Sequence, residues 1–163
     1  MASVQIREYV KDDRNFVVRC DSVRQRTVSS LDDMGICKLR NGYGSRMANL
    51  ILAEIRSGRA AIYIAEINKV RVGMVSAAVH TPSIAEVIEN GNMKIGVVTE
   101  LFVEPDSRRK GVAKKLMRSA ELFLKGIGCK ILSIHVISAN KAAINLYRKQ
   151  GYSEYEIVLD KRA

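Results

Sequence analysis

The chain has 163 residues, 47% of them hydrophobic, and a formal net charge of +10. This length and composition are typical of one folded domain with its own core, and we expect a single domain over residues 1–163. No apolar run is long enough to span a membrane. Three cysteines and two histidines lie far apart in the sequence, which argues against a disulfide framework and against a metal site.

The N-terminal segment lacks the apolar stretch of a signal peptide, so we expect a cytoplasmic protein without membrane association. The positive charge favours a polyanionic partner, such as a nucleic acid, an acidic surface or a multiply phosphorylated ligand. The placement of the basic residues along the chain has to decide among these partners.

Hydrophobic periodicity predicts a strand and two helices in the first third of the chain. Residues 3–9 alternate apolar and polar side chains, as a half-buried strand does. Asp12 or Asp13 precedes an apolar repeat of helical spacing and is expected to cap that helix. Ser45 is expected to cap a second helix, which ends at Gly58.

The rest of the chain predicts further strands and helices in alternation. In chain order these are a hairpin at 61–80, a loop or short helical turn at 82–92, a strand at 93–103, a helix that ends at 126–128, a strand at 131–137, a helix at 140–150 and a last strand or pair of strands at 152–159. This order predicts an α/β domain with a mixed, mostly antiparallel sheet of about six to seven strands and helices on both faces.

A basic stretch connects the strand at 93–103 to the helix that follows it. Six basic residues fall within the eleven positions 108–118, with Gly111 among them. Neither the nucleotide P-loop nor the dinucleotide fingerprint occurs here. A helix N-terminus with free N–H groups suits an anion, and cations there are unfavourable without one. The stretch is therefore either a solvated helix start or a cradle for a phosphate.

The same stretch closely resembles the signature of the GNAT superfamily of acetyl-CoA-dependent N-acetyltransferases. That pattern is a Leu-x-Val strand, a turn, and Gln/Arg-x-x-Gly-x-Gly/Ala at the start of a long helix. It is filled here by Leu101-Phe102-Val103, Arg108, Gly111 and Ala113. A second block, Asn140 to Tyr147 followed by Gly151-Tyr152, is similar to a later helix of the family. The resemblance covers nearly the whole chain.

The resemblance implies an acyltransferase that moves the acetyl group of acetyl-CoA directly to a primary amine of a small molecule, peptide or protein. It further implies that a strand edge binds the pantetheine arm and stabilises the thioester oxyanion, and that helix-start amides wrap the pyrophosphate. No metal takes part, and the family includes monomers and homodimers. The implied cofactor-binding residues are Leu101, Phe102, Val103, Arg108, Arg109, Lys110, Gly111, Val112, Ala113, Lys114, Asn140 and Tyr147.

Tyr147 is the predicted general acid. Asn140, Ile144 and Tyr147 are spaced four and three residues apart, which puts the helix cap and the phenol on one helix face. A phenol with a pKa near 10 suits protonation of a thiolate leaving group. The alternative is a core tyrosine whose hydroxyl is satisfied within the protein.

Glu100 is the predicted general base, drawing a proton from the amine through water. Regular strand alternation would place its side chain on the same face as Val98 and Phe102. Several relatives carry their catalytic glutamate a few residues earlier, where this chain has Val97, Val98 and Thr99, and this departure leaves the assignment of the base open.

Three other residues and the acceptor complete the predictions. His80 and His135 are expected to be exposed or structural. Tyr43 belongs to a glycine-rich segment that lines the acceptor pocket in relatives. The net charge predicts that polyamines are disfavoured and that acidic peptides or phosphorylated small molecules are tolerated.

Two rival functions remain beside the enzyme. The first is a noncatalytic coenzyme A sensor of the same fold, although the retained Tyr147 argues against it. The second is a nucleic-acid-binding module, for which basic residues should be interleaved with exposed aromatic residues. The chain has no tryptophan, and its basic residues are dispersed outside 108–118, which argues against nucleic acid.

Overall fold

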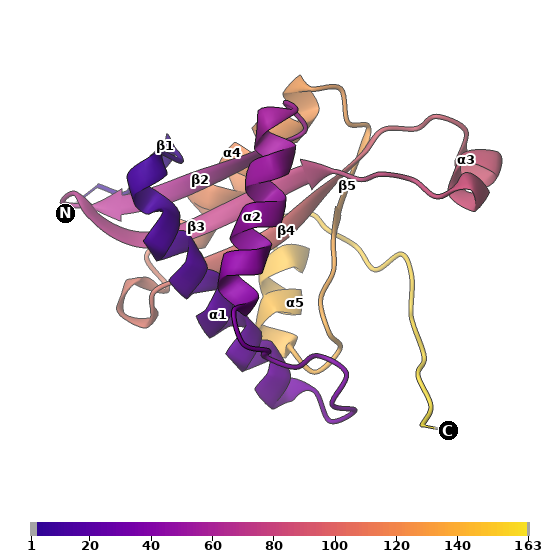
Figure 1. The fold of residues 1–163 in the computed structure, drawn as a ribbon, viewed down its shortest axis with the longest axis horizontal. Helices are drawn as coiled ribbons and strands as arrows, with labels where there is room; N and C mark the ends of the chain where they lie inside the picture. Colours follow the sequence, from indigo (N-terminus) through magenta and orange to yellow (C-terminus); the bar gives the residue numbers. More distant parts are fainter. Residues whose placement is uncertain (1–2, 163) are drawn as a thin grey trace.

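The structure is a computed structural model that describes residues 3–162. Within this range, five strands form one sheet in the order β1-β2-β3-β4-β5 (Figure 1). Neighbouring strands are antiparallel except for β4 and β5, which are parallel. The strands are β1 (Gln5–Glu8), β2 (Ala60–Ile67), β3 (Val70–Val79), β4 (Ile95–Val103) and β5 (Ile131–Ile134). The predicted α/β class with a mixed sheet is confirmed, with five strands in the described range where about six to seven were expected.

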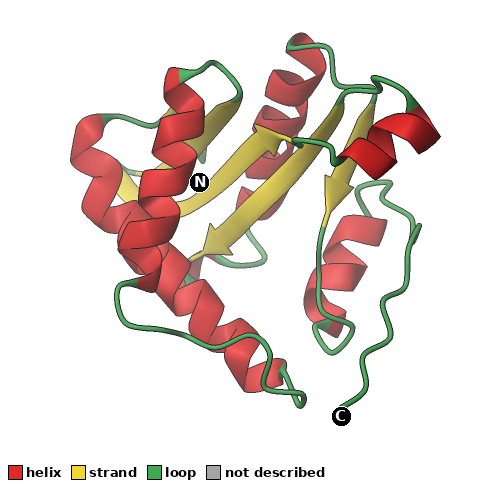
Figure 2. Ribbon diagram, turned by 45° about the vertical axis from the view of Figure 1, so that its right-hand side comes forward, coloured by secondary structure: helices red, strands yellow, loops and turns green. Residues whose placement is uncertain are grey.

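Helices cover both faces of the sheet, as predicted (Figures 1 and 2). One core cluster lies between the sheet and α1 and α2, and a second lies between the sheet and α4. The helices are α1 (Arg14–Leu31), α2 (Tyr43–Arg56), α3 (Ile84–Asn90), α4 (Val112–Gly126) and α5 (Lys141–Arg148). The two clusters give the sheet an α1/α2 face and an α4 face, and these names are kept below.

The close packing of α1 against α2 requires a glycine. A Cβ atom at Gly44 would lie 2.1 Å from the main-chain oxygen of Val18 and 2.4 Å from Ser22 Oγ. Any side chain at position 44 would therefore push the helices apart. The predicted cap, Ser45, lies inside the helix, because α2 begins at Tyr43 and has Gly42 as its N-cap.

The hairpin between β2 and β3 is confirmed, and its turn has a clear local cause. Asn68 and Lys69 both have positive φ, 51° and 63°. A two-residue turn with positive φ at both positions matches the right-handed twist of the flanking strands. This hairpin fixes β3 as the centre of the sheet, against which β4 pairs.

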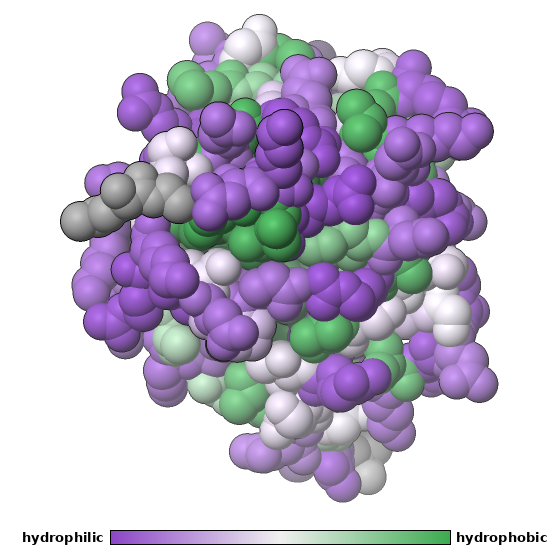
Figure 3. Space-filling model, turned by 90° about the vertical axis from the view of Figure 1, so that its left-hand side faces the viewer, coloured by the Kyte–Doolittle hydropathy of each residue, from purple (hydrophilic) through white to green (hydrophobic). Residues whose placement is uncertain are grey.

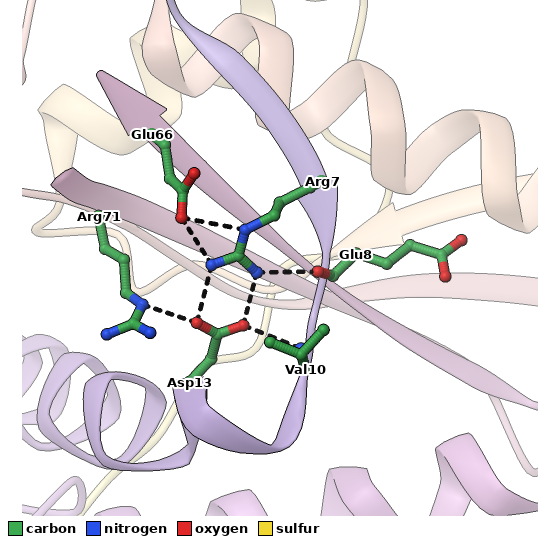
Figure 4. Close-up of polar contacts among 6 residues, drawn as sticks. All are labelled: Arg7, Glu8, Val10, Asp13, Glu66 and Arg71. Carbon is green, nitrogen blue, oxygen red and sulfur yellow. Dashed lines mark hydrogen bonds and ion pairs between the residues drawn. The ribbon is translucent and has the colours of Figure 1, made fainter. Parts of the chain in front are cut away.

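A buried ion cluster closes the end of the sheet near β1 (Figure 4). Asp13 is fully buried and accepts hydrogen bonds from Arg7 Nη1 and Nη2 at 2.6 and 2.9 Å. Arg71 Nε lies 2.7 Å from Asp13 Oδ1, and Arg7 also binds Glu66. Asp13 accepts from the N–H of Val10 and makes no side-chain hydrogen bond to α1. Asp13 thus occupies the N-cap position of α1 as predicted, but its carboxylate binds Arg7 of β1 and Arg71 of β3 rather than the helix N–H groups.

The predicted last strand is wrong. Residues 152–162 contain no strand and lead away from the sheet to the C-terminal end of the described chain (Figure 1). Tyr155, Ile157 and Leu159 are 98%, 78% and 90% exposed. The alternation of apolar residues in this segment is genuine, but alternation alone supplies no partner strand.

One face of the molecule is largely polar. On the side of the molecule seen in Figure 3, hydrophilic residues dominate and hydrophobic residues occupy smaller areas between them. Among the described residues, none of the helices has the length and apolar character needed to cross a bilayer.

Candidate active site

The strands β4 and β5 are paired along only part of β4. Their register runs from Ile95 opposite Ile131 to Val98 opposite Ile134. From Glu100 to Val103, β4 is paired with β3 alone. Figure 2 shows the two strands diverging toward their C-terminal ends, with α5 next to the end of β5. One edge of β4 therefore presents main-chain groups that can bond an extended ligand.

A β-bulge lies where β4 leaves β5. Ser76 is opposite Glu100 while Ala77 is opposite Val98, so Thr99 is the extra residue in β4. Ser76 Oγ and Thr99 Oγ1 are hydrogen-bonded at 2.7 Å. The bulge shifts the alternation of side chains by one residue.

The bulge changes the face on which Glu100 lies. Val98 packs in the core of the α4 face, whereas Phe102 packs in the core of the α1/α2 face. Glu100 contributes to a cavity beside α1 and α2. The prediction that Glu100 shares a face with both Val98 and Phe102 is therefore wrong for Val98, because it assumed an uninterrupted strand.

The turn between β4 and α4 carries a row of free main-chain N–H groups. Arg108 N–H is bonded to Pro105 O at 3.2 Å, and the next bond of this region runs from Lys115 N to Gly111 O at 3.2 Å. Within residues 3–162, the N–H groups of 109–114 have no protein acceptor. Arg109 and Gly111 have positive φ of 62° and 77°. Successive N–H groups in such a conformation form a concave site for an anion.

The side chains around this turn add positive charge without neutralising it. Within the described chain, no ion pair involves a basic residue of 108–118, and the first turn of α4 holds no acidic residue. Arg108 Nε donates to Val103 O at 3.1 Å, which ties the turn to the end of β4. A Cβ at Gly111 would meet no atom within 4 Å, so the space over the turn is open.

Helix α5 carries Asn140 at its start and Tyr147 near its end. Asn140 Oδ1 accepts from Ala143 N at 3.2 Å, which makes Asn140 the N-cap as predicted. Tyr147 is half-buried, and its ring lies 6.2 Å from that of Tyr152. Burial raises the pKa of Tyr147 above its usual value of 10, and the positive charge of Arg24 offsets part of the rise. The phenol is therefore protonated throughout the neutral range.

A cavity of about 240 Å³ lies between α1, α2 and the strands β3 and β4. Its walls are mostly apolar, and its polar groups come from both helices and both strands. The lining includes Asp21, Met47, Glu54, Met74, Ser76 and Glu100. This composition suits a small ligand with an apolar body and one or more polar ends.

Glu100 is held by Arg24 at the edge of this cavity. Arg24 Nη2 donates to Glu100 Oε1 at 2.9 Å, and Arg24 Nε forms an ion pair with Glu100 Oε2. Arg24 Nη2 also donates to the hydroxyl oxygen of Tyr43 at 3.0 Å. Tyr43, predicted to line the acceptor pocket, thus reaches the site through Arg24.

Asp21 lies one turn before Arg24 on α1 and is missing from the sequence-based predictions. It is 2% exposed, and its Oδ1 has no hydrogen-bond partner within residues 3–162. Burial raises the pKa of Asp21 to about 7, although the charge of Arg24 acts in the opposite direction. A signal existed, because Asp21 falls on the apolar stripe of α1 with Phe16, Val17 and Cys20.

The two histidines lie away from this arrangement. His80 Nε2 is 2.8 Å from Glu86 Oε1, and Glu86 completes the capping box at the start of α3. His135 is exposed and follows the end of β5. Neither contributes to the cavity or to the turn before α4, consistent with the structural role expected for them.

The chain is similar in sequence to known acetyltransferases. Residues 37–152 match the model of the Acetyltransferase (GNAT) family. The catalytic subunit of the N-terminal acetyltransferase A complex of Arabidopsis thaliana is 32% identical over 133 residues, which are 80% of this chain and 65% of that subunit. An uncharacterized N-acetyltransferase of Methanocaldococcus jannaschii is 31% identical over 96 residues, or 59% of this chain and 40% of that protein. The chain thus spans less than two thirds of these relatives.

Solved structures share the fold at low sequence identity. An aminoglycoside N-acetyltransferase in complex with coenzyme A superposes with a TM-score of 0.73 at 19% identity, covering 100% of this chain and 96% of that one. A GCN5-related N-acetyltransferase from Ralstonia eutropha gives 0.72 at 17% identity, covering 98% and 99%. The family match, covering well over half of the chain, agrees with the resemblance seen in its sequence motifs. The chain belongs to the acetyltransferase (GNAT) family.

Proposed function

We propose that this protein transfers the acetyl group of acetyl-CoA directly to a primary amine. The proposal rests on two sets of unpaired main-chain groups that follow one another along the chain. The free edge of β4 from Glu100 to Val103 runs into the unbonded N–H groups of 109–114. An extended arm that ends in phosphates fits that sequence of groups, because the edge bonds amides and the turn bonds anions.

The residues of the turn fit coenzyme A in charge as well as in shape. The uncompensated cations of 108–118 favour the several phosphate charges of this ligand. Arg109, Lys110, Gly111, Val112, Ala113 and Lys114 would supply main-chain donors, and Arg108 would hold the turn against β4. Leu101, Phe102 and Val103 would supply the edge, and Asn140 would lie on the opposite side of the arm.

Tyr147 is the proposed acid. Its protonated phenol, on the helix face that begins with Asn140, would deliver a proton to the departing thiolate. Acetyl-CoA supplies the activated acetyl group, so no covalent bond to the enzyme is needed. The amine must lose a proton before it reacts, and the carboxylates of the cavity, Glu100 among them, are the proposed acceptors.

The names of similar proteins support amine acceptors of two kinds. One relative is the catalytic subunit of an N-terminal acetyltransferase complex, and one structural neighbour is an aminoglycoside N-acetyltransferase. Both are named as acetyltransferases, and their names differ in the molecule that bears the amine. We therefore propose the reaction class and leave the acceptor to experiment.

Thiol release from acetyl-CoA tests this function. The protein is incubated with acetyl-CoA and separate pools of polyamines, aminoglycosides, amino acids and short peptides with free N-termini. Thiol release above the rate without acceptor, in at least one pool, is the expected result. Binding of acetyl-CoA without release in any pool would favour a coenzyme A sensor, and absence of acetyl-CoA binding would overturn the proposal.

A further inference from the structure

Two of the three carboxylates that line the cavity between α1, α2 and the sheet, Asp21 and Glu100, differ in their partners. Glu100 is engaged by Arg24 at both of its oxygens. Asp21, also buried, has an Oδ1 without any hydrogen-bond partner in the described chain. The two carboxylates belong to one site, and within residues 3–162 Glu100 has an ion pair whereas Asp21 has none.

A buried carboxylate without a partner is costly for a folded protein. Desolvation penalises its charge, and no donor in the described range compensates Oδ1. Stable proteins keep such groups mainly at functional sites, where a ligand supplies the missing donor. The ligand that would do so best is a cation with N–H groups, because it restores both the charge and the hydrogen bonds.

The other charged groups around Asp21 favour the same ligand. Glu54 on α2 and Glu100 on β4 line the cavity, and each is paired with an arginine, Glu54 with Arg59 and Glu100 with Arg24. β3 contributes the uncharged Ser76. Among the described residues, the charge left unpaired in the cavity is thus that of the Asp21 carboxylate, although the whole chain carries +10. The expectation that polyamines are disfavoured rests on the whole chain and does not describe this cavity.

We infer that Asp21 receives the ammonium group of the acceptor and accepts its proton, so that this site takes cationic primary amines with an apolar neighbouring segment. This inference rests on the proposed acetyl transfer. The apolar walls, including Met47 and Met74, would hold the carbon chain of the amine. Arg24 and Glu100 form the fixed side of the site.

The proposed transfer conserves protons and bonds. The ammonium gives one proton to the Asp21 carboxylate, and the nitrogen lone pair then forms a bond to the acetyl carbon while the carbon–sulfur bond breaks. Tyr147 gives its proton to the thiolate and regains one from the nitrogen. The proton on Asp21 is released to water. A carboxylate with a pKa near the working pH is suited to this transfer.

Binding of a simple ammonium ion tests the inference without turnover. Pentylammonium and the uncharged 1-pentanol are titrated into the wild type, Asp21→Asn and Asp33→Asn, with binding followed by NMR shifts. Asp33 is exposed and gives a control for the loss of one negative charge. We expect pentylammonium to bind the wild type and Asp33→Asn, to bind Asp21→Asn at least about tenfold more weakly, and to bind better than pentanol.

Several outcomes would overturn the inference. These are equal binding of pentylammonium to Asp21→Asn, equal binding of pentanol and pentylammonium to the wild type, or no binding of pentylammonium at all. Asp21→Asn should keep the affinity for acetyl-CoA and should unfold at an equal or higher temperature at pH 8, because a costly buried charge is removed. Loss of ammonium binding in a well-folded variant therefore reports on the site rather than on folding.

The same variants separate this inference from the proposed function. If acetyl-CoA fails to bind or no thiol is released, the acetyl transfer is wrong, while ammonium binding at Asp21 is judged by the titration alone. Once an acceptor is known, kcat/KM of the wild type should fall below about pH 7 as Asp21 becomes protonated. In Asp21→Asn, this fall of kcat/KM at low pH should be absent. If the variant still shows the fall, another group accepts the proton.

Discussion

Arg24 on α1 binds Glu100 on β4 through two nitrogen atoms, although 76 positions separate the residues in the chain. The same guanidinium donates to Tyr43 at the start of α2. One side chain thus connects both helices of the α1/α2 face to the strand that leads into the turn before α4. The geometry of the cavity depends on this connection.

Removal of Arg24 should destabilise the protein more than removal of both partners. Arg24→Met leaves the Glu100 charge buried, and we expect a loss of about 2–3 kcal/mol, less than for a fully buried pair because Arg24 is partly exposed. Arg24→Met combined with Glu100→Gln should recover part of this loss. Urea denaturation of the wild type, the single variants and the double variant measures the interaction free energy between Arg24 and Glu100. Additive effects of the two substitutions would show that the pair contributes no stability of its own.

Tyr147→Phe should slow acetyl transfer and leave the affinity for acetyl-CoA largely intact. The acid contributes on the order of 10²-fold to the rate. Because burial raises the pKa of Tyr147 above its usual value of 10, loss of wild-type activity through deprotonation of this phenol should begin at a higher pH than for an exposed tyrosine.

Tyr152→Phe is the matched control for this variant, since the two rings are in contact and Tyr152 donates to Glu121 at 3.2 Å. It should retain wild-type kcat. Equal kcat for the wild type and Tyr147→Phe, measured by thiol release at saturating acceptor, would remove Tyr147 from the mechanism.

Gly111→Ala should weaken acetyl-CoA binding by about tenfold, or about 1.4 kcal/mol. A Cβ at this position occupies the open space over the turn and strains a backbone with φ of 77°. Gly128→Ala introduces a comparable strain at φ of 88°, also without a nearby atom, but follows the end of α4. Calorimetric titration should therefore show normal acetyl-CoA affinity for Gly128→Ala, and similar losses in both variants would point to strain alone.

Asp13→Asn should lower the free energy of unfolding by about 3 kcal/mol, because Arg7 and Arg71 lose their shared buried anion while remaining partly exposed. Asp12→Asn, an exposed neighbour, should have little effect. Unfolding in urea at pH 7 compares the two variants. Equal stability of Asp13→Asn and the wild type would contradict the role given to this cluster.

The stabilisation by Asp13 should depend on pH in a definite direction. Burial acts to raise the pKa of Asp13, but hydrogen bonds from Arg7 and Val10 N–H and the arginine charges hold it below its usual value of 3.8. A lowered pKa in the folded state contributes stability above pH 3.8 that is lost as the pH falls through the folded-state pKa. The difference between the wild type and Asp13→Asn should therefore shrink only below about pH 4.

The parts of the candidate site that can be predicted from the sequence are those formed by residues adjacent in the chain. The strand before Val103, the turn with Gly111 and the start of α4 are contiguous, so their chemistry is visible in one stretch of sequence. The N-cap role of Asn140 is local for the same reason. The contact of Arg24 with Glu100 is not local in sequence. It depends on how α1 packs on the sheet, so no single stretch of sequence predicts it.

Three further features differ in how well sequence patterns predict them. Asp21 can be recognised in the sequence as a charged residue on the apolar stripe of a helix. A charge at such a position indicates a buried group that has a function. The bulge at Thr99 was not visible, because its position depends on the register between β3 and β4. The exposed segment that contains Ile157 shows the reverse case, a strand-like pattern to which the described chain supplies no partner.

The bulge at Thr99 has a consequence for how variants of this chain would behave. A variant in which β4 paired with β3 without the bulge, at unchanged chain length, would keep every proposed binding and catalytic residue, yet Glu100 would turn toward the α4 face. Catalytic competence would then depend on the register of one strand, and a comparison of residue identities alone would not reveal its loss.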